Sequence, residues 1–483
     1  MTPDKYIKNY IGGKQIPADS GDYLDSLNPV TGKVYAHFPD SNEQDVQSAL
    51  SEAQKASRLW MNFELEKRYR ILMRLADILE QEMKVFAKSE AIDVGKPYSM
   101  AMSVDVPQAY SCLRFYATSL PHYAGQAYYQ ERHSIHYTIR RPLGVVACFP
   151  HWSFSLLSLC QLLAPALVAG NTVLVVAPEL TPMSSYLLAK ACIAAGVPPG
   201  VVNIVYGETA RLSEFIFKEP LIQGIAYAGD AALGEKLAKN NQNPFRKTSF
   251  SLAAKNPAII FADCNFHKMI VETLRSSFSN NGQHPYSTSR LLVERTIYES
   301  FKEELLKRTQ FLKIGDTLST TTDLGAIISK EKLERLESYI TLAELEGGKI
   351  LCGGKALDLN GDLAEGFFFR PALIEGLEQS SRINQEDIFG PIVTMAPFDN
   401  DEEALQMANA SPYAKAASIW TQNTGRASKL AERLNAGLVW INSWMLKEDR
   451  ASFTPFANSG NAPLGGMEAL HFFTVKKTIG QPL

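Results

Sequence analysis

The residues best suited to chemistry lie in a polar segment, residues 279–290, which reads SNNGQHPYSTSR. His284 lies three residues before Ser287, and a histidine near a serine is the raw material of nucleophilic catalysis. Pro285 follows the histidine and offers neither a nucleophilic atom nor a backbone N–H. The proline also restricts the backbone of His284, and a single histidine in a polar loop is commonly a hydrogen-bonded structural residue. The local sequence therefore leaves a catalytic and a structural interpretation of His284 open.

The secondary-structure elements that must position this segment are predicted to alternate between strands and helices along the chain. The spacing predicts a helix after the capping-box pattern at residues 41–44. Strands are predicted at 144–149, 172–176, 201–205, 222–227 and 257–261, and helices up to 169, at 182–195, near 210, from 231, at 266–279 and through 298–307. Apolar strands alternating with helices predict parallel sheets covered on both faces. Residues 126–140 are strand-like and are expected to form an antiparallel excursion available for subunit contacts.

Composition excludes several classes of function. The 483 residues carry 48 basic and 51 acidic side chains without a basic run, which argues against a nucleic-acid partner. The six cysteines are scattered and form no Cys-x-x-Cys pair, so we expect a reducing compartment and neither a metal site nor a disulfide framework. The N-terminal residues lack a secretory signal, which makes a cytoplasmic location the expectation. The apolar stretch 153–170 contains Gln161 and Pro165 and is expected to be a buried helix, with no membrane contact.

Ordered motifs along nearly the whole chain resemble those of the aldehyde dehydrogenase superfamily. Phe278, Asn280, Gly282, Gln283 and Arg290 are in register with the segment Phe-x-Asn-x-Gly-Gln-x-Cys-x-x-x-x-Arg, which carries the thiol of that family. Further segments match in order and spacing: 149–154, 171–182, 197–207, 229–234, 251–257, 386–391 and 439–442. Residues 455–460 depart from the family's Pro-Phe-Gly-Gly-x-Lys-x-Ser-Gly run, so the substrate loop is expected to differ there.

The resemblance places three catalytic positions on residues of other types. Pro285 stands at the position of the family's cysteine, Ser251 at that of the general-base glutamate, and Ser153 at that of the oxyanion-hole asparagine. The proline cannot attack a carbonyl, and neither serine keeps the carboxylate or amide that it replaces. His284 is the candidate replacement group. The resemblance therefore predicts that oxidation through a thiohemiacetal at residue 285 is lost.

The resemblance also implies a site for NAD(P), with no metal. Glu179 and Val176 stand where the family holds the adenosine ribose with a glutamate and a lysine, and Phe389 resembles the aromatic residue that packs on the nicotinamide. The implied cofactor residues are Trp152, Val176, Glu179, Gly229, Asp230, Gly234, Asp387 and Phe389. Asp230 opens a helix, where it can cap the N-terminus or repel a phosphate. In both cases its carboxylate competes with a pyrophosphate and predicts weakened dinucleotide binding.

The expected fold is α/β and aldehyde dehydrogenase-like, with two doubly wound α/β domains and a small β element for bridging and oligomerisation. The expected boundaries are residues 1–119 and 143–250 for a Rossmann-like cofactor-type domain, 251–450 for a catalytic-type domain, and 120–142 with 460–483 for the bridging element. The resemblance implies a homo-oligomer, either a dimer or a tetramer, and allows a small-molecule ligand.

Three functions are compatible with these residues. The leading hypothesis is a pseudoenzyme that serves as a scaffold or ligand-binding subunit. The first alternative is a repurposed non-redox enzyme that uses the old substrate tunnel with His284 and the serines. The second alternative is an NAD(P)-dependent aldehyde oxidoreductase with a replaced mechanism.

Overall fold

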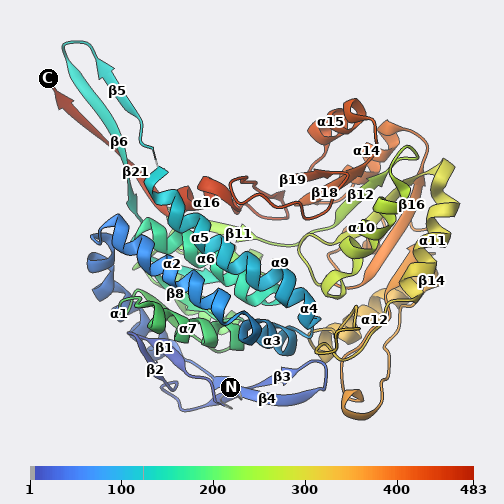
Figure 1. Ribbon diagram of the computed structural model, residues 1–483, viewed down its shortest axis with the longest axis horizontal. Coiled ribbons are helices and arrows are strands. Elements are labelled where there is room, and N and C mark those ends of the chain that lie inside the picture. The colour runs from blue at the N-terminus through green and yellow to red at the C-terminus, as the bar shows by residue number, and fades with distance from the viewer. Residues whose placement is uncertain (1–5, 123) are drawn as a thin grey trace.

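The computed structural model describes residues 6–122 and 124–483 and contains two seven-stranded sheets (Figure 1). The first sheet is parallel through its first five strands, and its last two strands run antiparallel at one edge. Its order is β11 (Lys247–Ser251), β10 (Ile222–Ala228), β7 (Val145–Phe149), β8 (Thr172–Val176), β9 (Val202–Val205), β1 (Asn9–Ile11) and β2 (Lys14–Ile16).

Helices cover both faces of the first sheet, because alternate residues of its buried strands point to opposite sides. Val146 and Cys148 of β7 belong to one hydrophobic cluster, whereas Val145 and Ala147 belong to another. The first cluster is covered mainly by α2 (Leu65–Gln81), α5 (Val106–Ser119), α6 (Ser155–Ala169) and α7 (Met183–Ala195), and the second mainly by α1 (Glu43–Met61) and α8 (Thr209–Lys218). The helices α3 (Met83–Val94) and α9 (Ala231–Lys239) complete this half of the described chain.

One apolar segment, Trp152–Ala169, is long and apolar enough to cross a membrane by length and composition alone. It consists of a short 3-10 turn, Trp152–Phe154, followed by α6, and 78% of it is buried inside the protein. Its contacts with the first hydrophobic cluster make it an interior helix, as the sequence predicted.

The second sheet repeats the doubly wound arrangement. Its order is β14 (Lys349–Cys352), β15 (Ala372–Glu375), β16 (Ile392–Phe398), β13 (Thr288–Glu294), β12 (Asn256–Ile260), β18 (Ala416–Trp420) and β19 (Leu438–Ile441), with only β14 antiparallel to its neighbour. One face packs against α10 (Phe266–Phe278) and α11 (Tyr298–Gln310), and the other against α14 (Asp401–Asn409) and α15 (Thr424–Arg433). The helix α12 (Lys330–Leu345) packs over Ile374 and Ile392 near the β14 edge.

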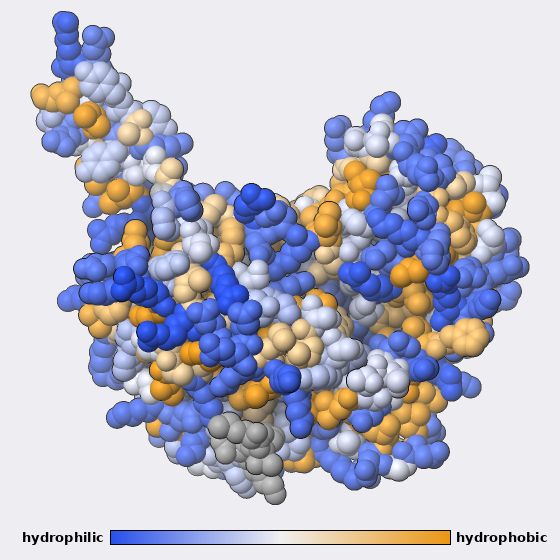
Figure 2. Space-filling view, viewed as in Figure 1, coloured by the Kyte–Doolittle hydropathy of each residue, from blue (hydrophilic) through white to orange (hydrophobic). Residues whose placement is uncertain are grey.

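A three-stranded antiparallel arm projects from the body of the protein (Figure 1). It consists of β5 (Ala127–Gln130), β6 (Ser134–Pro142) and β21 (Thr474–Pro482), with β6 in the middle. Apolar side chains are visible along it in Figure 2, and Tyr128 and Tyr129 are 58% and 66% exposed. The helix α16 (Gly466–Phe472) leads into β21, and a separate hairpin, β3 (Tyr23–Asn28) with β4 (Lys33–Pro39), lies near the N-terminus.

The predicted α/β class is confirmed, with two doubly wound sheets and a small β element. The predicted start of the first helix is one residue too early, because Asn42 caps α1 and forms the capping box with Asp45. Ser41 instead hydrogen-bonds Asn9. The chain passes from the first sheet to the second between β11 and β12, but the domain boundaries stay a prediction, and residues 1–5 and 123 within them lie outside the described residues.

Candidate active site

A cavity of about 480 Å³ lies beside the carboxyl ends of β7, β10 and β11 and the loop that precedes β13. This is where open α/β sheets commonly bind ligands. The structure brings nine of the predicted site residues to its wall: Trp152, Ser153, Gly229, Asp230, Ser251, His284, Pro285, Asp387 and Phe389. Val176, Glu179 and Gly234 do not line it.

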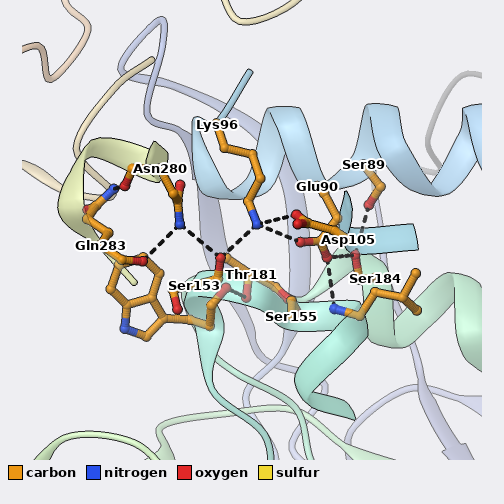
Figure 3. A network of polar contacts seen from close by, with 12 residues as sticks. Ser89, Glu90, Lys96, Asp105, Ser153, Ser155, Thr181, Ser184, Asn280 and Gln283 are labelled. Carbon is orange, nitrogen blue, oxygen red and sulfur yellow. Dashed lines mark hydrogen bonds and ion pairs between the residues drawn. The ribbon is translucent and has the colours of Figure 1, made fainter. Parts of the chain in front are cut away.

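A tight turn presents Ser153 to the cavity. The Nδ1 atom of His151 accepts a hydrogen bond from the backbone N–H of Ser153 at 3.0 Å and lies 2.8 Å from its Oγ. Burial, with smaller contributions from nearby lysines, lowers the pKa of His151 to about 3, so the ring is neutral. The carbonyl of Ser153 accepts from Lys96 Nζ at 2.7 Å and from Asn280 Nδ2 at 3.1 Å, which joins this turn to the loop before β13 (Figure 3).

Lys96 is the centre of a fully buried ionic network (Figure 3). Its Nζ lies 2.6 Å from Asp105 and 3.3 Å from Glu90, and it packs 4.0 Å from the centre of the Phe154 ring. Glu90 also accepts from the backbone N–H of Leu156 and so holds the start of α6. Burial raises the pKa of Asp105 to about 6 despite the attraction of Lys96. Sequence reasoning missed Lys96, although a lysine between Gly95 and Pro97 was a visible signal.

The loop before β13 holds Pro285 and His284 in fixed positions. Asn280 and Asn281 adopt left-handed backbone conformations, with φ of 52° and 53°, which asparagine tolerates better than most residues. The carbonyl of Pro285 accepts a hydrogen bond from Asn256 Nδ2 at 3.1 Å. The Nδ1 atom of His284 accepts from the backbone N–H of Tyr286 at 3.0 Å, which leaves Nε2 as the nitrogen that can meet a ligand.

Burial lowers the pKa of His284 to about 3, with smaller contributions from nearby cations. Its ring is enclosed by the aromatic rings of Phe154, Tyr286 and Trp444. The imidazole is therefore neutral across the physiological range. The hydrogen bond expected of a structural histidine is present, and a catalytic role for His284 stays a prediction.

Ser251 faces a lysine that sequence reasoning missed. Lys415 Nζ lies 3.4 Å from Ser251 Oγ and donates a hydrogen bond to the carbonyl of Leu252. Both residues line the cavity. Burial lowers the pKa of Lys415 to about 8, and the nearby Asp387 opposes this shift. The visible signal was a lysine directly before the apolar run 416–420, because a buried strand seldom begins with an unpaired cation.

Several of the predicted cofactor residues each have a structural role of their own in the protein. Asp230 caps α9, as predicted, because its carboxylate accepts from the backbone N–H groups of Ala232 at 2.9 Å and Leu233 at 3.2 Å. Glu179 accepts from the N–H of Thr209, and burial raises its pKa. Val176 is buried in β8. A Cβ at Gly234 would lie 2.5 Å from the Leu252 side chain, so close packing explains this glycine.

Phe389 and Asp387 are the two predicted cofactor residues on the loop that precedes β16. Phe389 has a φ of 53°, and its ring meets that of Trp152 edge to face at 5.5 Å. Asp387 accepts from the backbone N–H of Ala254 at 3.0 Å, and burial raises its pKa. These contacts fix an aromatic surface and a carboxylate at the wall of the cavity that Ser251 also lines.

All six cysteines carry free thiols, and Cys112 lines the cavity. Its Sγ lies 3.8 Å from the carbonyl of Cys160, and burial raises its pKa to about 12. The thiolate is the nucleophilic form, so Cys112 is nearly inert at neutral pH. Among residues 6–122 and 124–483, no group of three or more His, Cys, Asp or Glu side chains could hold a metal ion.

Comparisons with known proteins place this geometry in context. Residues 16–479 match the aldehyde dehydrogenase family. The 2-aminomuconic semialdehyde dehydrogenase of Bos taurus is 37% identical over 98% of this chain and 97% of its own length. The 2-hydroxymuconic semialdehyde dehydrogenase of Pseudomonas sp. (strain CF600) is 35% identical over 98% and 99%.

Solved structures agree with the sequence comparison. A putative aldehyde dehydrogenase from Burkholderia cenocepacia superposes with a TM-score of 0.96 at 31% identity, covering 98% of this chain and 97% of that one. The NAD⁺ complex of an aldehyde dehydrogenase from Bacillus cereus superposes with a TM-score of 0.96 at 30% identity, covering 99% and 97%.

The interpretation of this chain as a pseudoenzyme, scaffold or ligand-binding subunit is wrong, because full-length relatives are named as dehydrogenases. That interpretation rested on the residue types at positions 153, 251 and 285. It assumed that chemistry is confined to those positions. The structure brings Lys415 and Cys112, which lie outside the matched motifs, to the same cavity wall.

Proposed function

The chain belongs to the aldehyde dehydrogenase family, and on this premise we propose that it is an NAD(P)-dependent oxidoreductase that oxidises aldehydes by a mechanism without a thiol at residue 285. The observation that carries the proposal is one continuous cavity. Its wall combines residues at the family's cofactor positions, Asp387 and Phe389, with residues at its catalytic positions, Ser153 and Ser251.

The replaced residues constrain the chemistry. Pro285 has no nucleophilic atom, and the residues at the base and oxyanion positions are serines, so another group must activate the aldehyde. The overall reaction converts an aldehyde and water into a carboxylic acid, with a hydride leaving the aldehyde carbon and a proton released to solvent. NAD(P), when bound, accepts that hydride.

The described residues fit a dinucleotide at both ends of its expected path. Phe389 and Trp152 form an aromatic surface at the cavity wall on which a nicotinamide ring would pack, and the carboxylate of Glu179 can accept hydrogen bonds from a ribose. Between these two ends of the expected dinucleotide path, the carboxylate of Asp230 already accepts hydrogen bonds from backbone N–H groups in the first turn of α9. We therefore expect binding that is weaker than a free helix N-terminus would give.

Polar groups on the cavity wall can hold the substrate carbonyl. Ser153 and Lys415 line the cavity and carry donor groups, and an ammonium group stabilises a developing oxyanion. His151 and His284 are neutral and so can accept a proton only weakly at physiological pH. Lys415 has a pKa of about 8, and it is therefore the wall residue best placed to exchange a proton near neutral pH.

The apolar side chains that line the cavity favour an aldehyde with an apolar body. Its wall includes Phe115, Leu157, Trp440 and Phe453. The cation Lys447 is paired with Asp449 at 3.0 Å, so it offers little to a free carboxylate. A flat or branched apolar aldehyde fits this lining better than a small charged one.

Assembly and location complete the proposal. The exposed tyrosines of the arm, Tyr128 and Tyr129, fit a contact between copies of this chain, so a homodimer or homotetramer is expected. A cytoplasmic location is consistent with the free cysteines and the buried α6.

The test is a steady-state assay of reduced nicotinamide formation with aliphatic, aromatic and acidic aldehydes, with NAD and NADP compared. Calorimetric titration of each dinucleotide into the same preparation measures binding separately. We expect turnover with apolar aldehydes and binding of at least one dinucleotide. Failure to bind either dinucleotide, together with no turnover across the panel, would refute the proposal.

A further inference from the structure

Lys415 is a buried amine at the wall of the cavity. It directly precedes β18 of the second sheet, and only 2% of it is exposed. Its Nζ atom donates a hydrogen bond to the carbonyl of Leu252 and lies 3.4 Å from the Oγ atom of Ser251, the last residue of β11 in the first sheet. These contacts hold the amine between the two sheets. A side chain placed by sheet backbones keeps its position more firmly than one on a free loop.

The surroundings of Lys415 favour its uncharged form. Burial lowers its pKa to about 8, and Asp387 opposes this shift. His151 and His284 also interact with Lys415, but both are neutral because burial lowers the pKa of each to about 3. Roughly one in ten of the Lys415 side chains is therefore uncharged at pH 7, compared with fewer than about one in a thousand for an exposed lysine with a pKa near 10.4. The uncharged amine is the nucleophilic form.

We propose that Lys415 captures apolar aldehydes as a Schiff base within the cavity, a reversible covalent binding that needs no dinucleotide. A lysine removed from water in an apolar pocket is an established kind of nucleophile for carbonyl compounds. The cavity volume of about 480 Å³ lies in the range of small-molecule sites, and its wall includes Trp440 and Phe453. Capture at Lys415 rests on the proposed function in one respect only: the cavity must admit apolar aldehydes.

Capture is a condensation that neither oxidises nor reduces the aldehyde. The lone pair of neutral Lys415 attacks the carbonyl carbon, and a proton passes from nitrogen to the alkoxide to give a carbinolamine. The Ser251 hydroxyl is close enough to relay this proton. The carbinolamine hydroxyl takes up one proton from solvent and leaves as water, while the nitrogen lone pair forms the C=N bond. One amine, one aldehyde and one proton therefore give one iminium ion and one water molecule.

The charge of the iminium ion suits its surroundings. The ammonium and iminium forms of Lys415 each carry one positive charge on the same nitrogen. The nearby carboxylate of Asp387 favours the charged form of this group. A captured aldehyde therefore keeps a cation near Asp387, and the cost of a buried carboxylate without its cation is avoided.

A second buried lysine, Lys255, shows that position matters as much as basicity. It too is only 2% exposed, and burial lowers its pKa to about 7, below that of Lys415. However, Lys255 does not line the cavity, whereas Lys332 and Lys447 do. Lys332 is only partly buried, and Lys447 is paired with Asp449 at 3.0 Å. Lys415 combines a buried amine with a place at the cavity wall.

The experiment incubates the protein with benzaldehyde without dinucleotide for a series of times. Sodium borohydride then reduces the imine to a stable N-benzyl amine, and peptide mass mapping locates it. We expect Lys415 to be modified at least about tenfold faster than Lys332 or Lys447, because more of it is uncharged, and Lys255 to stay unmodified. The modified fraction of Lys415 should rise with pH about a midpoint near 8. Equal rates at Lys332 and Lys415, or modification of Lys255 first, would overturn the proposal.

Controls separate capture by the folded cavity from general lysine chemistry. The preference for Lys415 should vanish in guanidinium, where every lysine is exposed, and a preference that persists in the unfolded chain would contradict the role of the cavity. Lys415→Arg and Lys415→Met should remove most of the early adduct seen by intact mass, because neither side chain can form a Schiff base. Lys332→Met removes a lysine from the same wall and should keep that adduct. Thermal unfolding of each variant shows whether it folds.

The trapping assay contains no NAD(P), so its outcome is independent of aldehyde oxidation. A protein that oxidises aldehydes with a dinucleotide but forms no adduct at Lys415 would contradict capture alone. A protein that forms the adduct but binds no dinucleotide and turns over no aldehyde would contradict the oxidoreductase proposal alone.

Discussion

The carboxylate of Asp230 should weaken dinucleotide binding, and its replacement by serine should strengthen it. Asp230 Oδ1 accepts from the N–H groups of Ala232 and Leu233, where a pyrophosphate would otherwise approach α9. Serine caps a helix about as well as aspartate but carries no charge. The Asp230→Ser change therefore removes the repulsion and keeps the helix start.

The magnitude follows from Coulomb's law. Two unit charges about 4 Å apart repel by about 1 kcal/mol in water and about 4 kcal/mol at an effective dielectric of 20. Asp230 is exposed, so the value for water applies. A change of about 1 kcal/mol corresponds to roughly fivefold tighter binding.

Calorimetric titration of NAD into wild type and Asp230→Ser at low and high salt provides the measurement. Repulsion between exposed charges is screened over about 10 Å at 0.1 M salt, so the gain should shrink as salt rises. Asp230→Asn is the matched control, since it also caps α9 without a charge, and it should give the same gain. If both variants bind NAD no more tightly than the wild type, repulsion by Asp230 is not what limits affinity.

Three further changes test the buried groups around the cavity. Lys96→Met leaves Glu90 and Asp105 without their cation and should cost about 3–5 kcal/mol in denaturant unfolding, whereas a cost below about 1 kcal/mol would show that the network is not stabilising. Burial raises the pKa of Asp105 in the folded protein to about 6, above its unfolded value near 3.8. The contribution of Asp105 to the free energy of unfolding is therefore full below about pH 3.8 and is lost as the pH rises through 6. Asp105→Asn should flatten this part of the plot of unfolding free energy against pH, and an unchanged plot would contradict this assignment to Asp105. Cys112→Ser should keep aldehyde turnover within about twofold, because a thiol with a pKa of about 12 is not a nucleophile at neutral pH; complete loss would make Cys112 the missing thiol.

The sequence determined the local features of this protein. Alternating apolar strands and helices specify both sheets, because the pattern of side-chain burial repeats within each element. The cap at Asp230 and the absence of a nucleophile at Pro285 also follow from residue type alone. The same local information led to the mistaken pseudoenzyme interpretation, since it could judge only the motif positions.

Tertiary structure decided which groups share the cavity. Lys415 lies 164 residues from Ser251 along the chain, and the carbonyl of Ser153 is held by Lys96 and Asn280 from two different regions. Cys112 reaches the cavity from α5. No periodic pattern in the sequence encodes these contacts between distant residues, because they depend on how the two sheets pack against each other. Burial then set the chemistry, since only a lysine removed from water has its pKa lowered to about 8.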